Sequence, residues 1–360
     1  METKWWDVVV VGSGPGGSVA AKKCAESGLE TLLIEKKKLP RDKVCSGMIL
    51  GQWATDLVQQ EFGDIPTNVL VEPYNGVTFH IGREESITVQ TAISVGWRKN
   101  LDYWMCRGAI EKGVQIKDGT RLSGISEVQG GYELEVVGEN KETGRIYTRF
   151  IVGADGANST VRKLKWPDLK VRYRPVLREC YQVKLSIEKE QFHWFFPLVS
   201  ASPRFDVNYK EGHFLLEGNL KAVRGTIAEI LKDYGFPPEA KPTWVDGCVN
   251  PDLHDELLFT GSFVPAKNNI LLVGDAGAML FPFTHEGIGS ALKSGILAGE
   301  SIVEALARSG RAAPSYLRKF EGVKSFLKEL EVLRRGMADK AKKGPRALLE
   351  AMAELIKRTL

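Results

Sequence analysis

The sequence predicts an α/β fold with two lobes and a helical C-terminal tail. Three observations carry this prediction: a strand, glycine loop, helix and strand at the N-terminus, an aromatic and strand-rich middle, and a C-terminal stretch whose apolar residues recur at helical spacing. The chain has 360 residues, of which 43% are hydrophobic and 26% are charged, so it can form a large core.

The first unit has the order strand, helix, strand. Residues 7–11 form a short β-branched strand, residues 18–27 have the pattern of a helix, and residues 31–35 form the next strand. The loop between the first strand and the helix contains G-x-G-x-x-G, and Glu35 closes the second strand about twenty residues further on. These features predict a Rossmann-like lobe that binds a dinucleotide, with an ordinary glycine turn as the structural alternative.

Each position of this loop has a physical reason. Gly12 permits a tight turn, Gly14 lets the backbone approach a pyrophosphate, and Gly17 lets the helix pack closely on the strand. The helix N-terminus attracts phosphate, and Glu35 can accept hydrogen bonds from ribose hydroxyls. The loop alone does not separate FAD from NAD. The cofactor-binding residues predicted in this unit are Gly12, Gly14, Pro15, Gly16, Gly17, Glu35 and Lys36.

The middle of the chain supplies further elements in order. Residues 98–112 have a helical pattern, and residues 121–128 and 132–137 form a hairpin. Between about residues 170 and 260 the sequence is aromatic and strand-rich, with one helix at 221–234. The sequence therefore predicts an FAD-binding domain from 1–71, 97–169 and 261–313, an antiparallel-sheet substrate domain from 72–96 and 170–260, and a helical cap at 314–360.

A second glycine-containing loop, residues 153–162, directly follows a strand at 147–152. Its small residues allow a close approach, and Asp155 with Arg162 can tie the loop to neighbouring backbone and cofactor groups. An Asp-capped turn is the ordinary alternative. Asp155 and Gly156 are the predicted cofactor-binding residues of this loop.

A third loop follows a buried strand at 270–274 and leads into a long helix. Asp275 stands at the strand end, where it can accept a hydrogen bond from a ribityl hydroxyl. The helix start at Gly287, Ile288 and Gly289 directs amide groups and a positive dipole end toward the N1 and C2-carbonyl edge of a flavin. That edge is negative in the reduced anionic flavin, so this geometry favours reduction. Gly274 completes the predicted set.

The chain resembles the geranylgeranyl reductase family, within the flavoproteins related to aromatic hydroxylases and flavin-dependent halogenases. The residues that carry the resemblance are 12–17, 39–47, Arg98, 153–162 and 274–289, where P-F-T-H-E-G-I is similar to the P-F-T-G-E-G-I of prenyl reductases. The chain departs from the family pattern at Ser46 and at His285, where the family has glycine. These departures bear on the substrate more than on the cofactor.

The resemblance implies roles for particular residues. Arg98 matches an arginine near the cofactor phosphates, and Cys45 matches a cysteine beside the flavin ring. Trp194, Phe196 and Pro197 match a substrate-lobe signature and imply aromatic walls for an apolar chain; ordinary sheet core is the alternative. Cys45, His285 or solvent would deliver the proton, although Cys45 as a small buried hydrophobe and His285 as a loop residue are the plain alternatives.

The predicted function is reduction of carbon–carbon double bonds in an isoprenoid or similar apolar substrate by hydride transfer from flavin N5. A flavin monooxygenase or halogenase is the first alternative, and a flavoprotein electron carrier without small-molecule turnover is the second. No second dinucleotide motif offers a domain for NAD(P)H, so the electron donor is expected to be NADPH docking transiently or a ferredoxin-like protein.

Composition excludes several other classes. The formal net charge of +4 gives no reason to expect nucleic-acid binding. Five cysteines without C-x-x-C spacing argue against zinc or other metal sites, iron–sulfur clusters and disulfides. We expect a cytoplasmic protein without a signal peptide or transmembrane segment. The stretch 317–360 contains twelve Lys or Arg and six Asp or Glu, so contact with anionic lipid is the alternative to a solvated helical cap.

Overall fold

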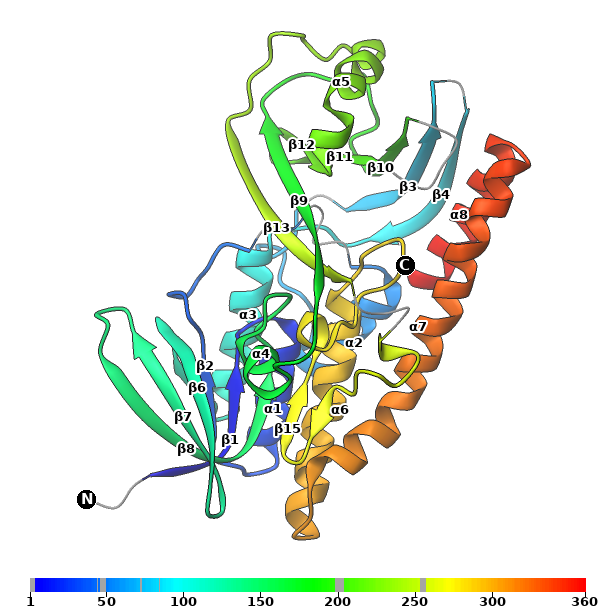
Figure 1. Ribbon diagram of the computed structural model, residues 1–360. Helices are drawn as coiled ribbons and strands as arrows, with labels where there is room; N and C mark the ends of the chain where they lie inside the picture. The colour runs from blue at the N-terminus through cyan, green and yellow to red at the C-terminus, as the bar shows by residue number, and fades with distance from the viewer. Residues whose placement is uncertain are drawn as a thin grey trace.

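The computed structural model describes residues 4–43, 45, 50–71, 73–83, 85–197, 204–252 and 257–360. Two sheets form two lobes, and a pair of C-terminal helices runs along both of them (Figure 1). The predicted fold class is confirmed: a Rossmann-like lobe, a second sheet lobe and a helical C-terminal tail.

The first sheet has parallel strands at its centre. β1, Trp5–Val11, pairs in parallel with β2, Thr31–Ile34, on one side and with β8, Thr143–Gly153, on the other. The residues of β1 from Val8 to Val11 are all buried and read as a continuous apolar run, as in a parallel sheet covered on both faces. The order is β14 (Ala266–Lys267), β15 (Ile270–Leu272), β8, β1, β2 and β5 (Gln115–Lys117), with β6 (Thr120–Val128) and β7 (Gly131–Gly138) as a hairpin beside β8.

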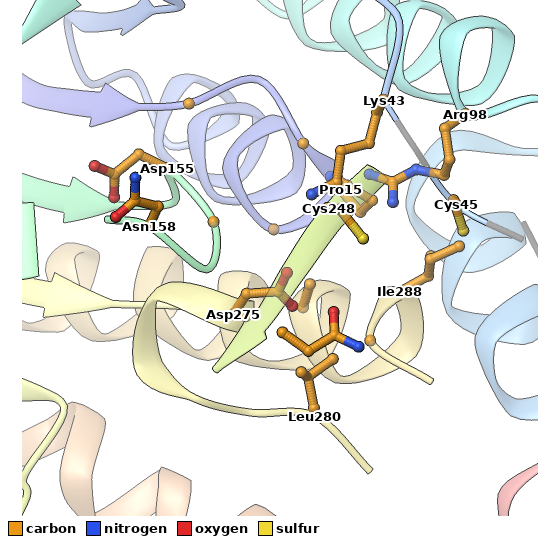
Figure 2. A pocket seen from close by; sticks show the side chains of 18 of the residues that line it. Pro15, Lys43, Cys45, Arg98, Asp155, Asn158, Cys248, Asp275, Leu280 and Ile288 are labelled. Carbon is orange, nitrogen blue, oxygen red and sulfur yellow. The ribbon is translucent and has the colours of Figure 1, made fainter. Parts of the chain in front are cut away.

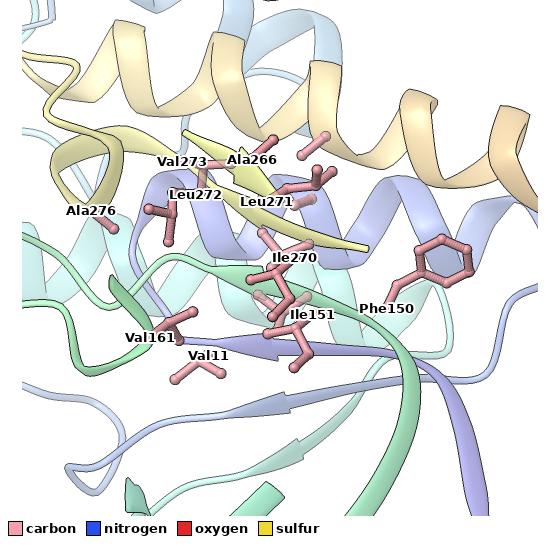
Figure 3. Packing of buried hydrophobic residues seen from close by; sticks show 14 of the residues in the cluster. Val11, Phe150, Ile151, Val161, Ala266, Ile270, Leu271, Leu272, Val273 and Ala276 are labelled. Carbon is pink, nitrogen blue, oxygen red and sulfur yellow. The ribbon is translucent and has the colours of Figure 1, made fainter. Parts of the chain in front are cut away.

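The core of this lobe lies between the sheet and its helices. Ile151 of β8 and Ile270 of β15 are partners in the parallel register and enter the same apolar cluster (Figure 3). The strand that ends in the third glycine loop is therefore anchored beside the strand that ends in the second.

Two helices of this lobe cross at glycines. α1, Pro15–Glu26, follows β1, and α6, Ile288–Ala307, follows β15 and the 3₁₀ turn Gly274–Gly277. A Cβ on Gly16 would lie 2.8 Å from the Ala291 carbonyl oxygen, and one on Gly295 would lie 2.3 Å from the Gly16 oxygen. The close crossing holds the N-termini of α1 and α6 at the same edge of the sheet. The remaining helices of the lobe are α2 (Gln52–Phe62), α3 (Arg98–Glu111) and α4 (Thr160–Lys165).

The second sheet is assembled from two separate segments of the chain. Its order is β13 (Trp244–Asp252), β9 (Arg172–Tyr181), β12 (His213–Gly218), β11 (Phe205–Lys210), β10 (Gln191–Phe196), β3 (Tyr74–Ile81) and β4 (Glu85–Ile93). Neighbouring strands are antiparallel except β3 and β10, which pair in parallel where the two segments meet. α5, Leu220–Leu231, and the 3₁₀ turn Lys232–Tyr234 cover one face.

The C-terminal helices are α7, Ala312–Lys342, and α8, Pro345–Thr359. α8 lies against β3 and β4 (Figure 1). The apolar residues at helical spacing are all buried, so they stabilise the fold and are not available to a membrane surface. They are Leu327, Leu330, Leu348, Leu349, Met352 and Leu355. Among the described residues, no helix has the length and apolarity needed to span a bilayer.

The element predictions differ from the structure mainly at boundaries. The helix predicted at 18–27 begins at Pro15, since proline is well accommodated at the first helical position. The strand predicted at 147–152 extends over Thr143–Gly153, because the hairpin strand β7 prolongs its pairing. α2 was not predicted, although Ala54, Leu57 and Val58 mark a buried face at helical spacing.

A histidine pair, of which His193 is buried and His80 partly buried, lies within the second sheet on the side of α5. His193 Nε2 donates to the Glu188 carbonyl at 2.8 Å, so its Nδ1 is left to accept from His80 Nε2 at 3.1 Å. The His80 ring also stacks on Phe195 with centroids 4.2 Å apart. Burial lowers the pKa of His80 to about 3, with His193 adding to the shift, and burial lowers the pKa of His193 to about 4. Both rings are therefore neutral in the folded protein at neutral pH.

This pair predicts acid sensitivity of the fold. A histidine whose folded pKa lies below its unfolded value of about 6.5 binds its proton preferentially in the unfolded state, so stability falls as pH drops below about 6.5. Between about pH 7.5 and pH 5 we expect a loss of roughly 2 kcal/mol per histidine in the free energy of unfolding. Urea unfolding measured across this range checks it, and His80→Phe should flatten the profile. An equally steep profile in His80→Phe would assign the acid sensitivity elsewhere.

Candidate cofactor and substrate cavity

A cavity of about 660 Å³ lies where the three glycine loops meet the second sheet. This volume is in the ordinary range of small-molecule and cofactor sites. Gly14, Asp155 and Asp275, which are far apart in sequence, all line it. Figure 2 shows the side chains of Asp155 and Asp275. The predicted site residues at its wall are Gly12, Gly14, Pro15, Gly16, Glu35, Lys36, Cys45, Arg98, Asp155, Gly156, Gly274, Asp275, His285, Gly287 and Ile288.

Two predicted site residues, Gly17 and Gly289, lie behind the cavity wall and allow close packing of helices. A Cβ on Gly17 would lie 1.9 Å from the Gly12 carbonyl oxygen, and a Cβ on Gly289 would lie 2.7 Å from the Trp53 ring. Neither residue is among the described residues that line the cavity. Gly17 therefore allows helix α1 to approach strand β1, as predicted, and Gly289 allows α6 to approach α2.

The glycine loop leaves an open space at the start of α1. Gly12 has φ +107°, and a Cβ there would lie 2.4 Å from the Ala154 carbonyl oxygen. Gly14 differs, because a Cβ at Gly14 would meet only two guanidinium nitrogens, of Arg41 at 3.7 Å and of Arg98 at 3.9 Å. A helix N-terminus and two arginines thus surround an open space beside Gly14, which is what a pyrophosphate requires.

A single buried carboxylate, Asp102, orients both arginines. Arg98 Nε and Nη2 donate to the two Asp102 oxygens at 2.7 and 2.9 Å, and Arg41 Nη2 lies 3.1 Å from Oδ2. Burial acts to lower the pKa of the Arg98 guanidinium, but Asp102 outweighs it and the pKa is raised. Arg98 is therefore held charged, and both guanidiniums are held in position beside Gly14.

Glu35 ends the strand beside this loop with its carboxylate already engaged. Glu35 Oε2 accepts from the Ser13 amide at 3.1 Å, from the Ser13 hydroxyl at 2.8 Å and from Arg41 Nε at 3.1 Å, while Oε1 accepts from the Lys37 amide at 3.0 Å. Burial acts to raise the pKa of Glu35, and Arg41 with these hydrogen bonds lowers it below its usual value. Glu35 is therefore an ionised acceptor at the cavity wall.

The second loop is tied to backbone as the sequence predicted. Asp155 accepts from the Ser159 hydroxyl and the Thr160 amide, each at 2.5 Å, and so caps α4. Arg162, which is buried, donates to the carbonyl oxygens of Asp275 at 3.2 Å and of Ala276 at 2.8 Å. Arg162 thereby links the second glycine loop directly to the third. A direct contact between Asp155 and the cofactor stays a prediction.

The third loop opens on the cavity at the start of α6. Gly287 lies close to Asp275, since a Cβ on Gly287 would be 3.2 Å from Asp275 Oδ1. Glu286 Oε1 accepts from the Gly289 amide at 2.7 Å, and burial, as the main cause, raises the pKa of Glu286 to about 7. The His285 side chain is exposed at the cavity wall on a residue with φ +54°.

Comparison with known proteins agrees with this geometry. Residues 6–172 match the family described as FAD binding domain. Over 337 residues the chain is 26% identical to the digeranylgeranylglycerophospholipid reductase of Methanococcus vannielii, covering 88% of this chain and 81% of the relative. The chain is an FAD-dependent oxidoreductase, and it is similar in sequence to digeranylgeranylglycerophospholipid reductases.

Solved structures share the fold of this flavoprotein. A geranylgeranyl bacteriochlorophyll reductase-like protein from Thermoplasma acidophilum has a TM-score of 0.77 at 18% identity, covering 99% of this chain and 98% of that one. The p-nitrophenol 4-monooxygenase of Pseudomonas putida has a TM-score of 0.75 at 13% identity, with the same coverage. A reductase-like protein and a monooxygenase therefore share this architecture, so the fold alone does not distinguish the two reactions.

The second sheet holds Cys45 in this flavoprotein. Arg178 Nη1 donates to the Cys45 carbonyl oxygen at 2.7 Å, and the rest of the Arg178 guanidinium pairs with Asp246 at 2.9 and 2.6 Å. Figure 2 shows Cys45 and Arg98 on one side of the cavity and Asp155 on the other. Ser46, the departure from the family pattern, lies outside the described residues.

The residues predicted to form an aromatic substrate wall do not line the cavity. Trp194 and Phe196 are buried in a core with Phe79 and Phe283, beneath α8, and neither they nor Pro197 are among the described residues lining the cavity. Trp194 and Phe196 instead belong to an apolar cluster that also contains residues of α8. The second sheet instead lines the cavity with Arg174, Val176, Arg204, Asp206, Glu217 and Cys248.

Sequence reasoning also missed functional residues of the first lobe. Arg41 lay in a segment used only for the family resemblance, yet it contacts Glu35 and Asp102 and faces Gly14. Its signal was a basic residue in the loop directly after the strand that ends in Glu35. Lys43 also lines the cavity, near Arg98 (Figure 2).

Proposed function

We propose that this flavoprotein reduces carbon–carbon double bonds of an isoprenoid or other largely apolar substrate. The observation that carries the proposal is the convergence of the three glycine loops, Cys45 and the start of α6 on one cavity that the second sheet closes. Relatives across most of the chain are named as reductases of digeranylgeranylglycerophospholipid, which supports the same reaction class.

The residues present fit FAD. Gly14 has open space where a Cβ would be, and Arg41 and Arg98 stand beside it to hold phosphates. Glu35 is placed to accept from ribose hydroxyls, Asp275 from a ribityl hydroxyl, and the N-terminus of α6 to stabilise negative charge on the ring. When bound, FAD supplies the hydride chemistry, while the protein orients the reacting groups and excludes water.

Cys45 is the proposed proton donor to the substrate, with His285 or solvent as the alternatives. Its backbone is fixed by Arg178, and it lines the cavity near Arg98. Because general acid catalysis typically contributes about 10²–10⁴-fold, we expect Cys45→Ala to lower kcat by at least about 100-fold while FAD content stays unchanged. Unchanged turnover in Cys45→Ala would move the proton to His285 or solvent, and His285→Asn would then separate those two.

The electron donor and the location are part of the same proposal. We propose NADPH docking transiently, or a ferredoxin-like protein, as donor in the cytoplasm. Any contact of α7 and α8 with anionic lipid would depend on their basic residues, since their apolar residues at helical spacing are buried.

The deciding experiment is anaerobic. The FAD-loaded protein is reduced chemically and mixed with geranylgeraniol, and the product is identified by mass spectrometry. We expect a product heavier by two hydrogens for each double bond reduced, together with flavin reoxidation. A product that forms only when oxygen is admitted would establish a monooxygenase or, with halide present, a halogenase. Flavin reoxidation by a protein acceptor alone, without a small-molecule product, would establish an electron carrier.

A further inference from the structure

One face of the second sheet changes from aromatic to charged across neighbouring strands. The pairing registers place one residue of each strand in a row across this face: Phe79 on β3, Trp194 on β10, Asp206 on β11, Glu217 on β12, Arg178 on β9 and Asp246 on β13. Since residues in register share a face, the aromatic and charged halves are parts of one surface.

The two halves face different parts of the molecule. The aromatic half, Phe79 and Trp194, is packed with Phe283 in the core beneath α8. In the charged half, Asp206 and Glu217 line the cavity. The opposite face of the same strands is apolar and packs against α5. This part of the wall that the second sheet presents to the cavity is therefore charged.

Asp206 is a buried carboxylate of this wall that is incompletely satisfied. It is only 7% exposed, and Oδ1 is buried without a hydrogen bond from any described residue. Its ion-pair partner among the described residues is Arg204, whose Nε lies 3.4 Å from the same Oδ1, too far for a good hydrogen bond. Arg204 also donates to the Phe283 carbonyl at 2.9 Å and lies 4.2 Å over the Trp194 ring. Burial raises the pKa of Asp206 to about 6, with Arg204 opposing the shift.

A buried carboxylate without hydrogen bonds destabilises a fold by about 1–3 kcal/mol or more, so its presence at a cavity wall points to a ligand. The sign of the surrounding charge narrows the ligand. Glu217 is the cross-strand partner of Asp206, while the cations Arg204 and Arg178 already have carboxylate partners in Asp206 and Asp246. An anionic group bound here would be repelled by the carboxylates of Asp206 and Glu217. A hydrogen-bond donor would instead give Asp206 Oδ1 the hydrogen bond that it lacks.

We propose that the substrate carries a hydrogen-bond-donating group, a hydroxyl or a protonated amine, that binds Asp206. The inference rests on the proposed function and narrows its substrate class to a largely apolar molecule with an uncharged or cationic polar end. It disfavours a phosphate at this position.

The experiment measures binding to the oxidised, FAD-loaded protein, from the change in flavin absorbance. The probes are geranylgeraniol, which has a donor, its methyl ether, which has none, and geranylgeranyl phosphate, with geranylgeranylamine as the cationic donor. Because a hydrogen bond to a charged group contributes about 1.5–3 kcal/mol, the alcohol should bind at least about ten-fold more tightly than the ether. A stronger preference for the amine than for the alcohol would identify a cationic substrate.

Variants assign the preference to Asp206. Asp206→Leu should reduce the alcohol-to-ether difference to within about two-fold, and Asp206→Asn, which keeps an acceptor but not the charge, should give an intermediate value. Asn208→Leu is the matched control, because Asn208 is the next residue on the same face of β11 and is not among the described residues that line the cavity. It should keep the wild-type preference. FAD content and unfolding temperature show that each variant folds.

The outcomes separate this inference from the proposed function. Tighter binding of the ether or the phosphate, or a difference that survives in Asp206→Leu, would overturn the role of Asp206. Benzyl alcohol and benzyl methyl ether are measured alongside as a pair without a prenyl chain. If only the benzyl pair binds and shows the preference, the isoprenoid proposal fails while the donor site stands. If no pair binds, or none shows a preference, the donor site is wrong.

Discussion

Gly14→Val will weaken FAD binding strongly and leave the fold stable, whereas Gly17→Val will destabilise the fold. The two glycines belong to one motif, but the space around them differs. A Cβ on Gly14 meets nothing closer than a guanidinium nitrogen at 3.7 Å, and the backbone there is extended, with φ −75° and ψ −178°. A Cβ on Gly17 would lie 1.9 Å from a backbone oxygen. The valine methyls at Gly14 would instead occupy the space proposed for the pyrophosphate.

We expect the FAD dissociation constant of Gly14→Val to rise by at least about 100-fold, equivalent to roughly 2.7 kcal/mol. Its free energy of unfolding without FAD should change by about 1 kcal/mol at most, the usual range for a helix N-cap. For Gly17→Val we expect at least about 3 kcal/mol of destabilisation, because the Gly12 carbonyl is backbone and cannot move away from the new side chain. Flavin titration and urea unfolding of the apoproteins measure both. FAD binding retained by a folded Gly14→Val would place the pyrophosphate elsewhere.

The parts of the fold that were predictable depend on local sequence. The buried run ending at Val11, the glycine loop and the strand ending at Glu35 follow one another within about thirty residues, and each has its own pattern. The Asp155 cap was predictable for the same reason, since its partners lie within six residues. Local hydrogen bonds and side-chain spacing are properties that a sequence displays directly.

The parts that were not predictable depend on which elements meet. The residues of β10 alone do not show that α8, about 150 residues later, packs into the same apolar cluster as Trp194 and Phe196. The position of Arg41 likewise depends on its ion pair with Asp102 on α3. The charged wall around Asp206 arises only when β11, β12, β9 and β13 are in register. Tertiary pairing decided each of these cases.

Arg162→Leu will destabilise the protein by about 3–5 kcal/mol and release the cofactor. The Arg162 side chain is 1% exposed, and its guanidinium donates to the Asp275, Ala276 and Ala157 carbonyl oxygens and to the Tyr173 hydroxyl. Leucine removes these donors and leaves buried carbonyl oxygens without partners, each worth about 1–3 kcal/mol. The Asp275 loop and the Asp155 loop would then lose the contact that holds them at one cavity.

Lys163→Leu is the matched control for this replacement. Lys163 is the next residue of α4, is exposed and bonds only to the Asn158 side chain among the described residues, so its loss should change stability by no more than about 0.5 kcal/mol. Urea unfolding and FAD titration of both variants measure the difference. If Arg162→Leu lost stability but kept full FAD affinity, the second and third loops would be positioned by their strands alone. If Arg162→Leu lost both stability and FAD affinity while Lys163→Leu lost neither, Arg162 would be the residue that holds the second and third loops at one cavity.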